Sequence, residues 1–160
     1  MSEGPAGGRD SRPEDPALSQ DAPDSVPVHG ADTHQLYKRG LDLLGRGSPA
    51  AAAQLLERAA AAEPRSRSVL EALARAQFDA GQYSAAAGNF GRIVEASPTD
   101  DYAQFGLGLA LARTGDHRAA AEHLALAAAM RPNLRHYTDA LRSVRATLRA
   151  RDELRKGSQD

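Results

Sequence analysis

Small, large and turn-forming residues recur in phase along residues 33–134. Nothing between residues 33 and 153 alternates apolar and polar positions for long enough to indicate a β-strand. Alanine, the strongest helix former, dominates the stretches 50–62 and 117–130. The pattern therefore predicts an all-α protein.

The pattern has a fixed period. Pro64, Pro98 and Pro132 lie 34 residues apart, and the windows 33–66, 67–100 and 101–134 superimpose on that spacing. Matching columns hold small residues, large apolar residues and turn glycines: Gly40, Ala74 and Gly108; Ala52, Ala86 and Ala120; Leu56, Phe90 and Leu124; Gly47, Gly81 and Gly115. Such a period indicates a stack of small units and not one global core.

Each window is predicted to hold two helices that approach closely. Glycine inside a helix costs about 1 kcal/mol relative to alanine, so Gly40 and Gly108 suggest a packing requirement. The column of Gly47, Gly81 and Gly115 is expected to end the first helix in a left-handed conformation. The three prolines are expected to stop the second helix. The expected N-caps are Ser48 (followed by Pro49 in the first turn), Asp100, Asp116 and Asn133.

These columns resemble the tetratricopeptide repeat, a helix–turn–helix unit of about 34 residues. The resemblance covers residues 33–134 and is strongest in the second unit. That unit runs from Leu70-x-x-Leu73-Ala74 through Gly81-x-Tyr83-x-x-Ala86-x-x-x-Phe90 to Pro98. Departures from the family's preferences occur at Arg39, Pro49, Gln77, Gln104 and His117. The resemblance implies an α–α superhelix of three helical hairpins over residues 32–134.

The two ends of the chain differ from the repeats. Residues 135–153 are expected to form a capping helix, because Tyr137, Leu141, Val144 and Leu148 share one apolar face. Residues 154–160 are expected to be a disordered tail. Residues 1–31 contain five prolines and few large apolar groups, so a disordered acidic tail is expected there, with His29 before the first helix.

Charge is distributed unevenly along the chain. Residues 1–32 carry seven acidic and two basic residues, whereas residues 135–160 carry seven basic and four acidic residues. Attraction between opposite charges would bring the acidic front of the chain toward the basic last helix. Arginine supplies 18 of the 20 basic residues, and together with the many alanines and glycines this hints at a bacterial source.

The resemblance also implies a binding face. In tetratricopeptide arrays the first helices line a concave groove, where ligands usually bind. The matching residues are Tyr37, Leu41, Glu71, Arg75, Phe78, Tyr102, Phe105, Leu109 and Arg113, with Leu44 and Asp79 beside them. An aromatic and aliphatic strip with a few charges suits a peptide with apolar anchors. Two alternatives stay open: Phe78 and Leu44 pack only between neighbouring units, or the groove is filled by the protein's own tail or by a neighbouring cap helix.

One class of ligand is disfavoured. Some family members hold the C-terminal carboxylates of a peptide with lysine, asparagine and arginine side chains. The matching positions here are Tyr37, Leu41, Ala72, Tyr102 and Gly106. None of these side chains donates a charged hydrogen bond to a carboxylate.

Little in the sequence indicates chemistry. The chain has no cysteine, and no phosphate loop or nucleophile motif occurs. His29 and His34 are five residues apart and His117 and His123 are six apart, so neither pair shares a helix face for a metal. We therefore expect no catalysis, no cofactor and no metal. No apolar run is long enough to span a membrane and no secretory signal is visible, so a soluble cytoplasmic protein is expected.

Two functions from different classes follow. The first is a non-catalytic module that binds a peptide or protein partner in the groove. The alternative is a binder of nucleic acid or of an acidic partner, through Arg142, Arg145 and Arg149 of the last helix. Nucleic acid is disfavoured because the net charge of the whole chain is only −1. Pairing between copies through an end helix is also open.

Overall fold

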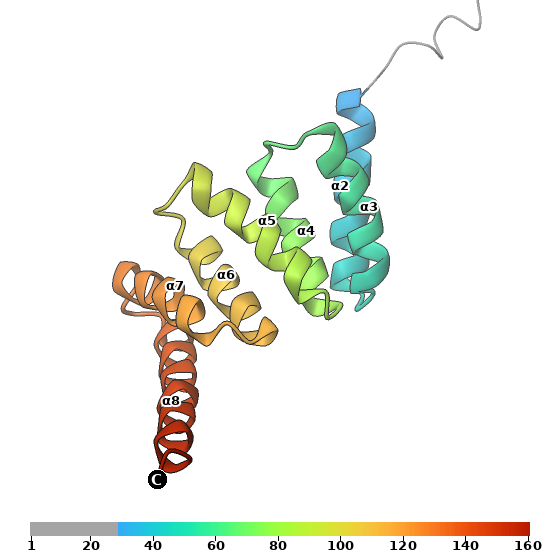
Figure 1. Cartoon of the computed structure of the whole chain (residues 1–160). Coiled ribbons are helices and arrows are strands. Elements are labelled where there is room, and N and C mark those ends of the chain that lie inside the picture. Colours follow the sequence, from blue (N-terminus) through green and yellow to red (C-terminus); the bar gives the residue numbers. More distant parts are fainter. Residues whose placement is uncertain (1–28) are drawn as a thin grey trace, which may run out of the picture.

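The computed structural model describes residues 29–160, and within that range the chain forms seven α-helices and no strand. The helices are α2 (His29–Gly45), α3 (Pro49–Ala62), α4 (Arg67–Asp79), α5 (Tyr83–Ala96), α6 (Asp101–Thr114), α7 (His117–Met130) and α8 (Arg135–Gly157) (Figure 1). The expected all-α fold of three helical hairpins followed by a last helix is confirmed.

The helices form a curved stack. Each helix packs on the next one along the chain, and the first helices α2, α4, α6 and α8 also contact one another in succession. The second helices α3, α5 and α7 share no contact with one another in the part of the chain described. The stack is therefore closed on the side of the first helices and splayed on the other, so α2, α4 and α6 line its concave face.

The turns follow the sequence pattern closely. Gly47, Gly81 and Gly115 have φ angles of 80°, 82° and 98°, the left-handed region expected for a glycine that ends a helix. The side chains of Asp100 and Asp116 accept hydrogen bonds from the backbone N–H groups of Ala103 and Ala119 at 3.1 Å. Both aspartates therefore cap the helices that follow them, as predicted.

Other helix ends differ from expectation. Ser48 precedes α3, but its side chain makes no capping hydrogen bond, and Pro49 supplies the start of the helix. Leu134, and not Asn133, occupies the N-cap position of α8, where no side chain caps the helix. His29 begins α2 instead of preceding it. The disordered tail expected for residues 1–31 is wrong for residues 29–31, which belong to α2, and its remaining part, residues 1–28, lies outside the described residues.

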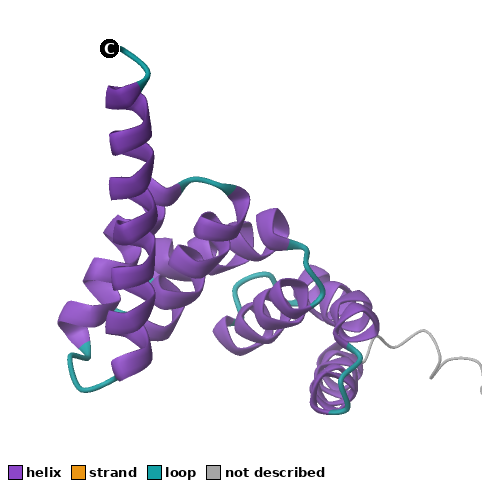
Figure 2. Cartoon of the chain, turned by 90° about the horizontal axis from the view of Figure 1, so that it is seen from below, coloured by secondary structure: helices purple, strands orange, loops and turns teal. Residues whose placement is uncertain are grey.

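The last helix is longer than the sequence suggested. It continues to Gly157 and not to 153, so the expected disordered tail is wrong for residues 154–157. Arg155 and Lys156 lie in the final turn, where positive charge interacts favourably with the negative end of the helix dipole. Figures 1 and 2 show α8 running well past the helices on which it packs.

Within the first and third hairpins a glycine of the first helix faces a leucine of the second. A Cβ atom added to Gly40 would lie 2.6 Å from Cγ of Leu56, and one added to Gly108 would lie 2.6 Å from Cγ of Leu124. Both leucines are completely buried. The same close approach joins neighbouring units, since a Cβ on Gly106 would lie 2.5 Å from the ring of Phe90. The predicted packing role of Gly40 and Gly108 is confirmed.

The two buried glutamines that depart from the family pattern have hydrogen-bond partners. Gln77 accepts a hydrogen bond from Nδ2 of Asn89 at 2.8 Å. Gln104 donates to the carbonyl oxygen of Pro98 at 2.9 Å, and its Oε1 lies 2.8 Å from Nδ1 of His123. Each of these buried side chains thus has at least one hydrogen-bond partner inside the stack, which lowers the cost of burying it.

Helix α8 takes the place of a first helix in a fourth unit. It begins at Arg135, 34 residues after α6 begins at Asp101, and it buries Tyr137, Leu141 and Val144. The hydroxyl of Tyr137 donates a hydrogen bond to Asp101 at 2.8 Å. The column that holds Gly40 and Gly108 in the first and third units holds Arg142 here. The long side chain of an arginine at that position prevents another helix from packing closely, so the stack ends with a polar face.

We predict that Gly108→Ala destabilises the protein. The new Cβ would meet Cγ of Leu124 and also the carbonyl oxygen of Ala120, 3.2 Å away, which is backbone that cannot rotate aside. Overpacking costs about 1–3 kcal/mol and outweighs the helix-propensity gain of about 1 kcal/mol. The matched control is Gly88→Ala in α5, where a Cβ has nothing within 4 Å and propensity alone should stabilise. Urea unfolding followed by circular dichroism measures both, and a Gly108→Ala protein as stable as wild type would contradict the close packing.

Candidate functional site

A hollow of about 240 Å³ opens between α4 and α6 and is called the concave hollow below. Its lining residues are Arg75, Phe78 and Asp79 of α4, Phe90 of α5, and Tyr102, Phe105, Gly106 and Leu109 of α6. Most of the lining comes from first helices, so the hollow lies on the concave side of the stack. Gly106 contributes backbone where a side chain would collide with Phe90.

The aromatic walls are held by contacts with other rings. Phe90 and Tyr102 meet edge to face with ring centroids 6.1 Å apart. Phe105 stacks on Tyr137 of α8 at 4.5 Å and also meets the ring of His136 at 5.3 Å. Such ring pairs add to the stability given by burial alone. Phe105 therefore both lines the hollow and holds α8 on the stack.

Charged groups stand at the edge of the concave hollow. Arg75 and Asp79 are exposed on α4 and make no hydrogen bond or ion pair with another described residue. Burial raises the pKa of Tyr102 above its ordinary value, so its hydroxyl is a neutral donor at pH 7. The hollow thus combines an apolar interior with one cation, one anion and one hydroxyl that could meet a bound chain.

Arg113 lies against aromatic side chains of the α4–α5 hairpin. Its guanidinium lies over the rings of Phe78 and Tyr83, 5.6 and 5.1 Å from their centroids, and donates to the Tyr83 hydroxyl at 2.8 Å. These are cation–π contacts that tie α6 to the α4–α5 hairpin. Arg113 does not line the concave hollow. The alternative that Phe78 packs between units is supported in part, because one side of its ring is covered in this way.

The other predicted groove residues are spread along the face. Of the nine, Arg75, Phe78, Tyr102, Phe105 and Leu109 meet at the concave hollow. Tyr37 lines a separate hollow of about 300 Å³ beside Thr33, His34, Glu63, Ser66, Ser68 and Val69. Leu41 is 36% exposed and lines neither hollow. Glu71 pairs with Arg67. A role for these residues in binding a partner stays a prediction.

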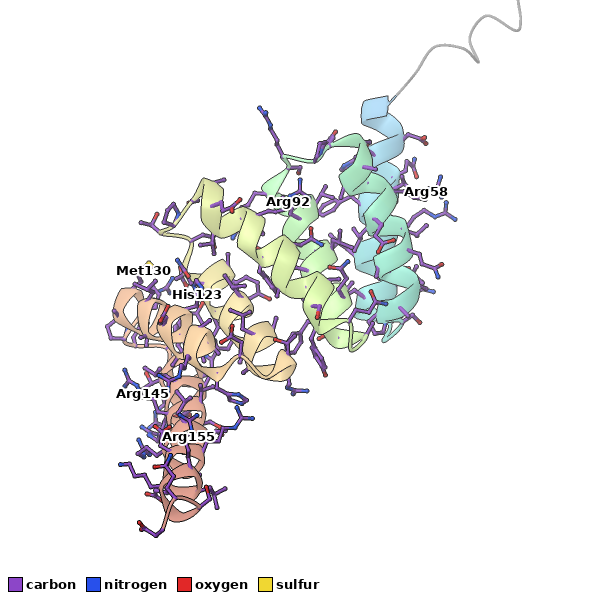
Figure 3. All side chains as sticks on the ribbon, viewed as in Figure 1. Arg58, Arg92, His123, Met130, Arg145 and Arg155 are labelled. Carbon is purple, nitrogen blue, oxygen red and sulfur yellow. The ribbon has the colours of Figure 1, made fainter. Side chains whose placement is uncertain are left out.

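Basic residues gather on one side of α8. Arg135, Arg142, Arg145, Arg149 and Lys156 are separated by seven, three, four and seven residues, the spacing of a single helix face. We call these five residues the basic face of α8. Arg142 pairs with Asp139 at 3.0 Å, and the other four make no ion pair with a described residue. The three arginines predicted as an alternative surface, Arg142, Arg145 and Arg149, are all exposed and therefore lie on one exposed face of α8; Figure 3 labels Arg145 on this helix.

A wider hollow, of about 620 Å³, was not predicted from the sequence. We call it the connection hollow, because it lies beside the connection between α3 and α4. Its lining residues are Pro64, Arg65, Arg67, Leu70, Arg92, Ile93, Glu95, Ala96, Ser97 and Asp100. These residues come from two successive windows and form no motif, so no local signal in the sequence could have indicated them.

Two of the three arginines that line the connection hollow are held by hydrogen bonds. Asp100 accepts hydrogen bonds from Nε and Nη2 of Arg67 at 2.6 and 3.0 Å, a bidentate arrangement. This hydrogen bonding lowers the pKa of the Asp100 carboxyl below its ordinary value. Arg92 donates to the carbonyl oxygen of Pro64 at 2.8 Å, beside the α3–α4 connection (Figure 3).

No arrangement for metal chemistry occurs in residues 29–160, where no group of three or more His, Cys, Asp or Glu side chains converges. Within the same range, every helix is too short or too polar to cross a bilayer.

A model of the tetratricopeptide repeat matches residues 37–101 and again residues 71–134, together more than half of the chain. The chain belongs to the tetratricopeptide repeat family. The resemblance inferred from the three prolines and the small-residue columns is thereby confirmed. A comparison with curated protein sequences finds no match.

Solved tetratricopeptide structures share the fold. The first tetratricopeptide domain of Spaghetti (RPAP3), bound to the HSP90 peptide SRMEEVD, is 18% identical, with 76% of this chain and 98% of that chain covered and a TM-score of 0.69. The Sgt2 domain from Aspergillus fumigatus is 20% identical, with 76% and 82% covered and a TM-score of 0.69. MamA is 20% identical, with 87% and 77% covered and a TM-score of 0.68. At these identities the likeness establishes the fold alone.

The Arg67–Asp100 pair predicts a pH dependence of stability in this tetratricopeptide array. Because the pKa of Asp100 is lowered by folding, its contribution is present above the unfolded pKa, about 3.9, and is lost as the pH falls through the lower folded value. Asp100→Asn keeps a good N-cap for α6 but removes the charge that Arg67 meets. The variant should be about 1 kcal/mol less stable at pH 7, as for an exposed pair.

The measurement is urea unfolding of both proteins between pH 7 and pH 2.5. The difference in the free energy of unfolding should shrink below pH 4, because protonation removes the same charge from the wild type. A difference that stays constant over this range would assign the loss to capping and not to the ion pair.

Proposed function

We propose that this tetratricopeptide array is a non-catalytic interaction module that binds a peptide or protein partner along its concave face. The concave hollow receives one apolar side chain of the partner, while Arg75 and Asp79 meet charges on either side of it. The observation that supports this proposal most is the convergence of three aromatic walls from first helices on one open hollow. Buried aromatic side chains at the centre of an interface are typical energetic hot spots.

The size of the concave hollow favours a side chain over a small-molecule ligand. At about 240 Å³ it is smaller than the roughly 300–1,000 Å³ typical of small-molecule pockets. A partner residue of aromatic or long aliphatic type would fill it and exclude water. The rest of the partner would lie along α2, α4 and α6, where Tyr37 lines a second hollow.

The RPAP3 domain bound to an HSP90 peptide is a precedent within the fold for peptide binding. Recognition of the C-terminal carboxylates of a peptide, which some family members use, does not suit this array. The positions that match the family's carboxylate-binding residues hold Tyr37, Leu41, Ala72, Tyr102 and Gly106. We therefore expect an internal segment of the partner, bound through its apolar anchor and not through a terminal carboxylate.

The proposal is tested with peptides selected from a random display library against the full chain, and with affinity measured by fluorescence anisotropy. Tyr102→Ala should weaken the selected peptides about tenfold or more, the loss expected for a buried aromatic contact. Arg75→Glu should weaken peptides that carry an acidic residue beside the anchor. Thermal unfolding checks that Tyr102→Ala remains folded.

The matched control is Arg58→Glu, an exposed arginine on the outer helix α3 that makes no contact with the concave face (Figure 3). It should leave affinity unchanged. Peptides that bind equally well to wild type and to both concave-face variants would place the binding site elsewhere. Phe105→Ala is less suited to the test, because Phe105 also stacks on Tyr137 of α8.

A second candidate function rests on the basic face of α8, where four of five cations have no partner among the described residues. It would bind nucleic acid or an acidic partner, and its affinity would fall steeply with salt because counterions are released. The concave hollow, being largely apolar, would give a shallow salt dependence.

Binding of a fluorescent DNA duplex and of a polyglutamate peptide, each at 50 and 300 mM salt, tests this candidate. The triple variant Arg142→Glu, Arg145→Glu and Arg149→Glu should abolish binding at low salt, whereas Arg58→Glu should preserve it. Absence of binding to both probes by the wild type at 50 mM salt would eliminate the candidate.

A further inference from the structure

The connection hollow is separate from the two surfaces of the proposed function. It shares no lining residue with the concave hollow or with the basic face of α8. Its volume, about 620 Å³, is enough for several side chains. It is built by the first turn of α4, the last turns of α5 and the residue that precedes α6. An inference about this hollow therefore does not depend on the proposed function.

The connection hollow has an apolar floor and a basic rim. Leu70 and Ile93 are only 4% and 2% exposed and form part of the floor. Arg65, Arg67 and Arg92 stand around it, and all three are exposed. Arg67 is matched by Asp100, which leaves Arg65 and Arg92 against the single carboxylate of Glu95. Arg65 makes no hydrogen bond or ion pair with another described residue.

The chain enters the array at this same end. Helix α2 is joined to α3 by a short turn and runs antiparallel to it, so the start of α2 lies near the end of α3 and the connection that follows (Figure 1). Thr33, His34 and Tyr37 share a hollow with Glu63 and Ser66 of that connection. Residues 64–68 separate this hollow from the connection hollow, because they contribute lining residues to both.

The sequence just before α2 complements the connection hollow. Residues 14–28 carry four carboxylates, Glu14, Asp15, Asp21 and Asp24, and no lysine or arginine. Asp24 and Asp21 lie five and eight residues before His29. An extended chain covers about 3.3–3.6 Å per residue and packed helices lie about 8–10 Å apart, so these carboxylates can reach about two to three helix spacings from the start of α2.

We propose that the acidic segment of this same chain, residues 14–28, docks in the connection hollow. Asp21 and Asp24 face Arg65 and Arg92 at the rim of the hollow, above the apolar floor formed by Leu70 and Ile93. The segment thereby covers the outer side of the second repeat and leaves the concave hollow open. The contact is weak and reversible, since it uses exposed ion pairs that salt screens.

The position of α2 in the stack determines whether the acidic segment meets the connection hollow or the basic face of α8. The basic face carries more unpaired charge, but α8 lies at the opposite end of the stack from α2. Effective concentration falls as the chain that joins two groups must span a greater distance. The segment next to His29 therefore meets the connection hollow first, contrary to the attraction toward the last helix that charge alone suggests.

Paramagnetic relaxation tests the proposal in the full chain. Because the chain has no cysteine, Ser19→Cys carries a nitroxide label at one position only. In ¹⁵N-labelled protein at low salt, the amides of residues 65–67 and 92–97 should relax at least about threefold faster than those of residues 75–79 and 105–109. Addition of 0.5 M NaCl should reduce the difference, because the Debye length then falls to a few ångströms.

Charge reversal gives the matched variants. Arg65→Glu with Arg92→Glu should lower the enhancement at residues 92–97 about three- to fivefold, the range for exposed ion pairs. Arg142→Glu with Arg149→Glu, on the basic face of α8, should leave it unchanged. Arg65→Glu alone, at a side chain without a partner, gives the same test with a smaller loss of about twofold if the double variant does not fold.

Three results would overturn the proposal. The first is an enhancement that is strongest on α8 or at the concave hollow. The second is an enhancement spread evenly over residues 29–160. The third concerns a mixture of two chains, one with the nitroxide but without ¹⁵N and the other with ¹⁵N but without the nitroxide. An enhancement of equal size in this mixture would mean that the segment docks on a second copy.

Discussion

The structure depends on one close contact, a small residue of the first helix placed against a large residue of the second. Gly40 faces Leu56 and Gly108 faces Leu124, in each case with no room for even a methyl group. Glycine weakens a helix, so this contact must recover more through dispersion and burial than it loses in helix propensity. Because the contact lies within a hairpin, it recurs from unit to unit, and neighbouring units cover each other's apolar surface in one continuous core from α3 to α6.

The curvature of the stack, the position of its binding face and the way the stack ends all follow from this helical hairpin. First helices contact one another in succession while second helices do not, so the stack bends and its aromatic residues meet on the concave side. Gly106 extends the same rule between units, since the absent side chain admits the ring of Phe90. In α8 the small-residue column is filled by Arg142, which prevents a further helix from packing and gives the end of the stack a charged surface.

Periodic features of the structure could be predicted from the sequence, and contacts between distant units could not. The left-handed glycines and the caps at Asp100 and Asp116 depend only on residues nearby in the sequence. The repeating columns were therefore sufficient to predict them. The stacking of Arg113 on Phe78, and of Phe105 on Tyr137, joins residues about one period apart whose orientation depends on curvature. The connection hollow is lined by the Arg67–Asp100 pair, whose two residues stand at opposite ends of one window, 33 positions apart, with no local motif to connect them. The length of α8 was underestimated because its last turns bury little, and the apolar pattern used to define it ends at Leu148.

The most direct test of the central contact is a double-mutant cycle between Gly108→Ala and Leu124→Ala, with the free energy of unfolding measured for all four proteins. If the methyl group added by Gly108→Ala and the side chain of Leu124 compete for the same space, the cost of the first substitution should largely disappear in the second background. That outcome is a coupling energy of about 1 kcal/mol or more. Costs that simply add would mean that the two positions do not press on each other, and the account of how these helices pair would be wrong.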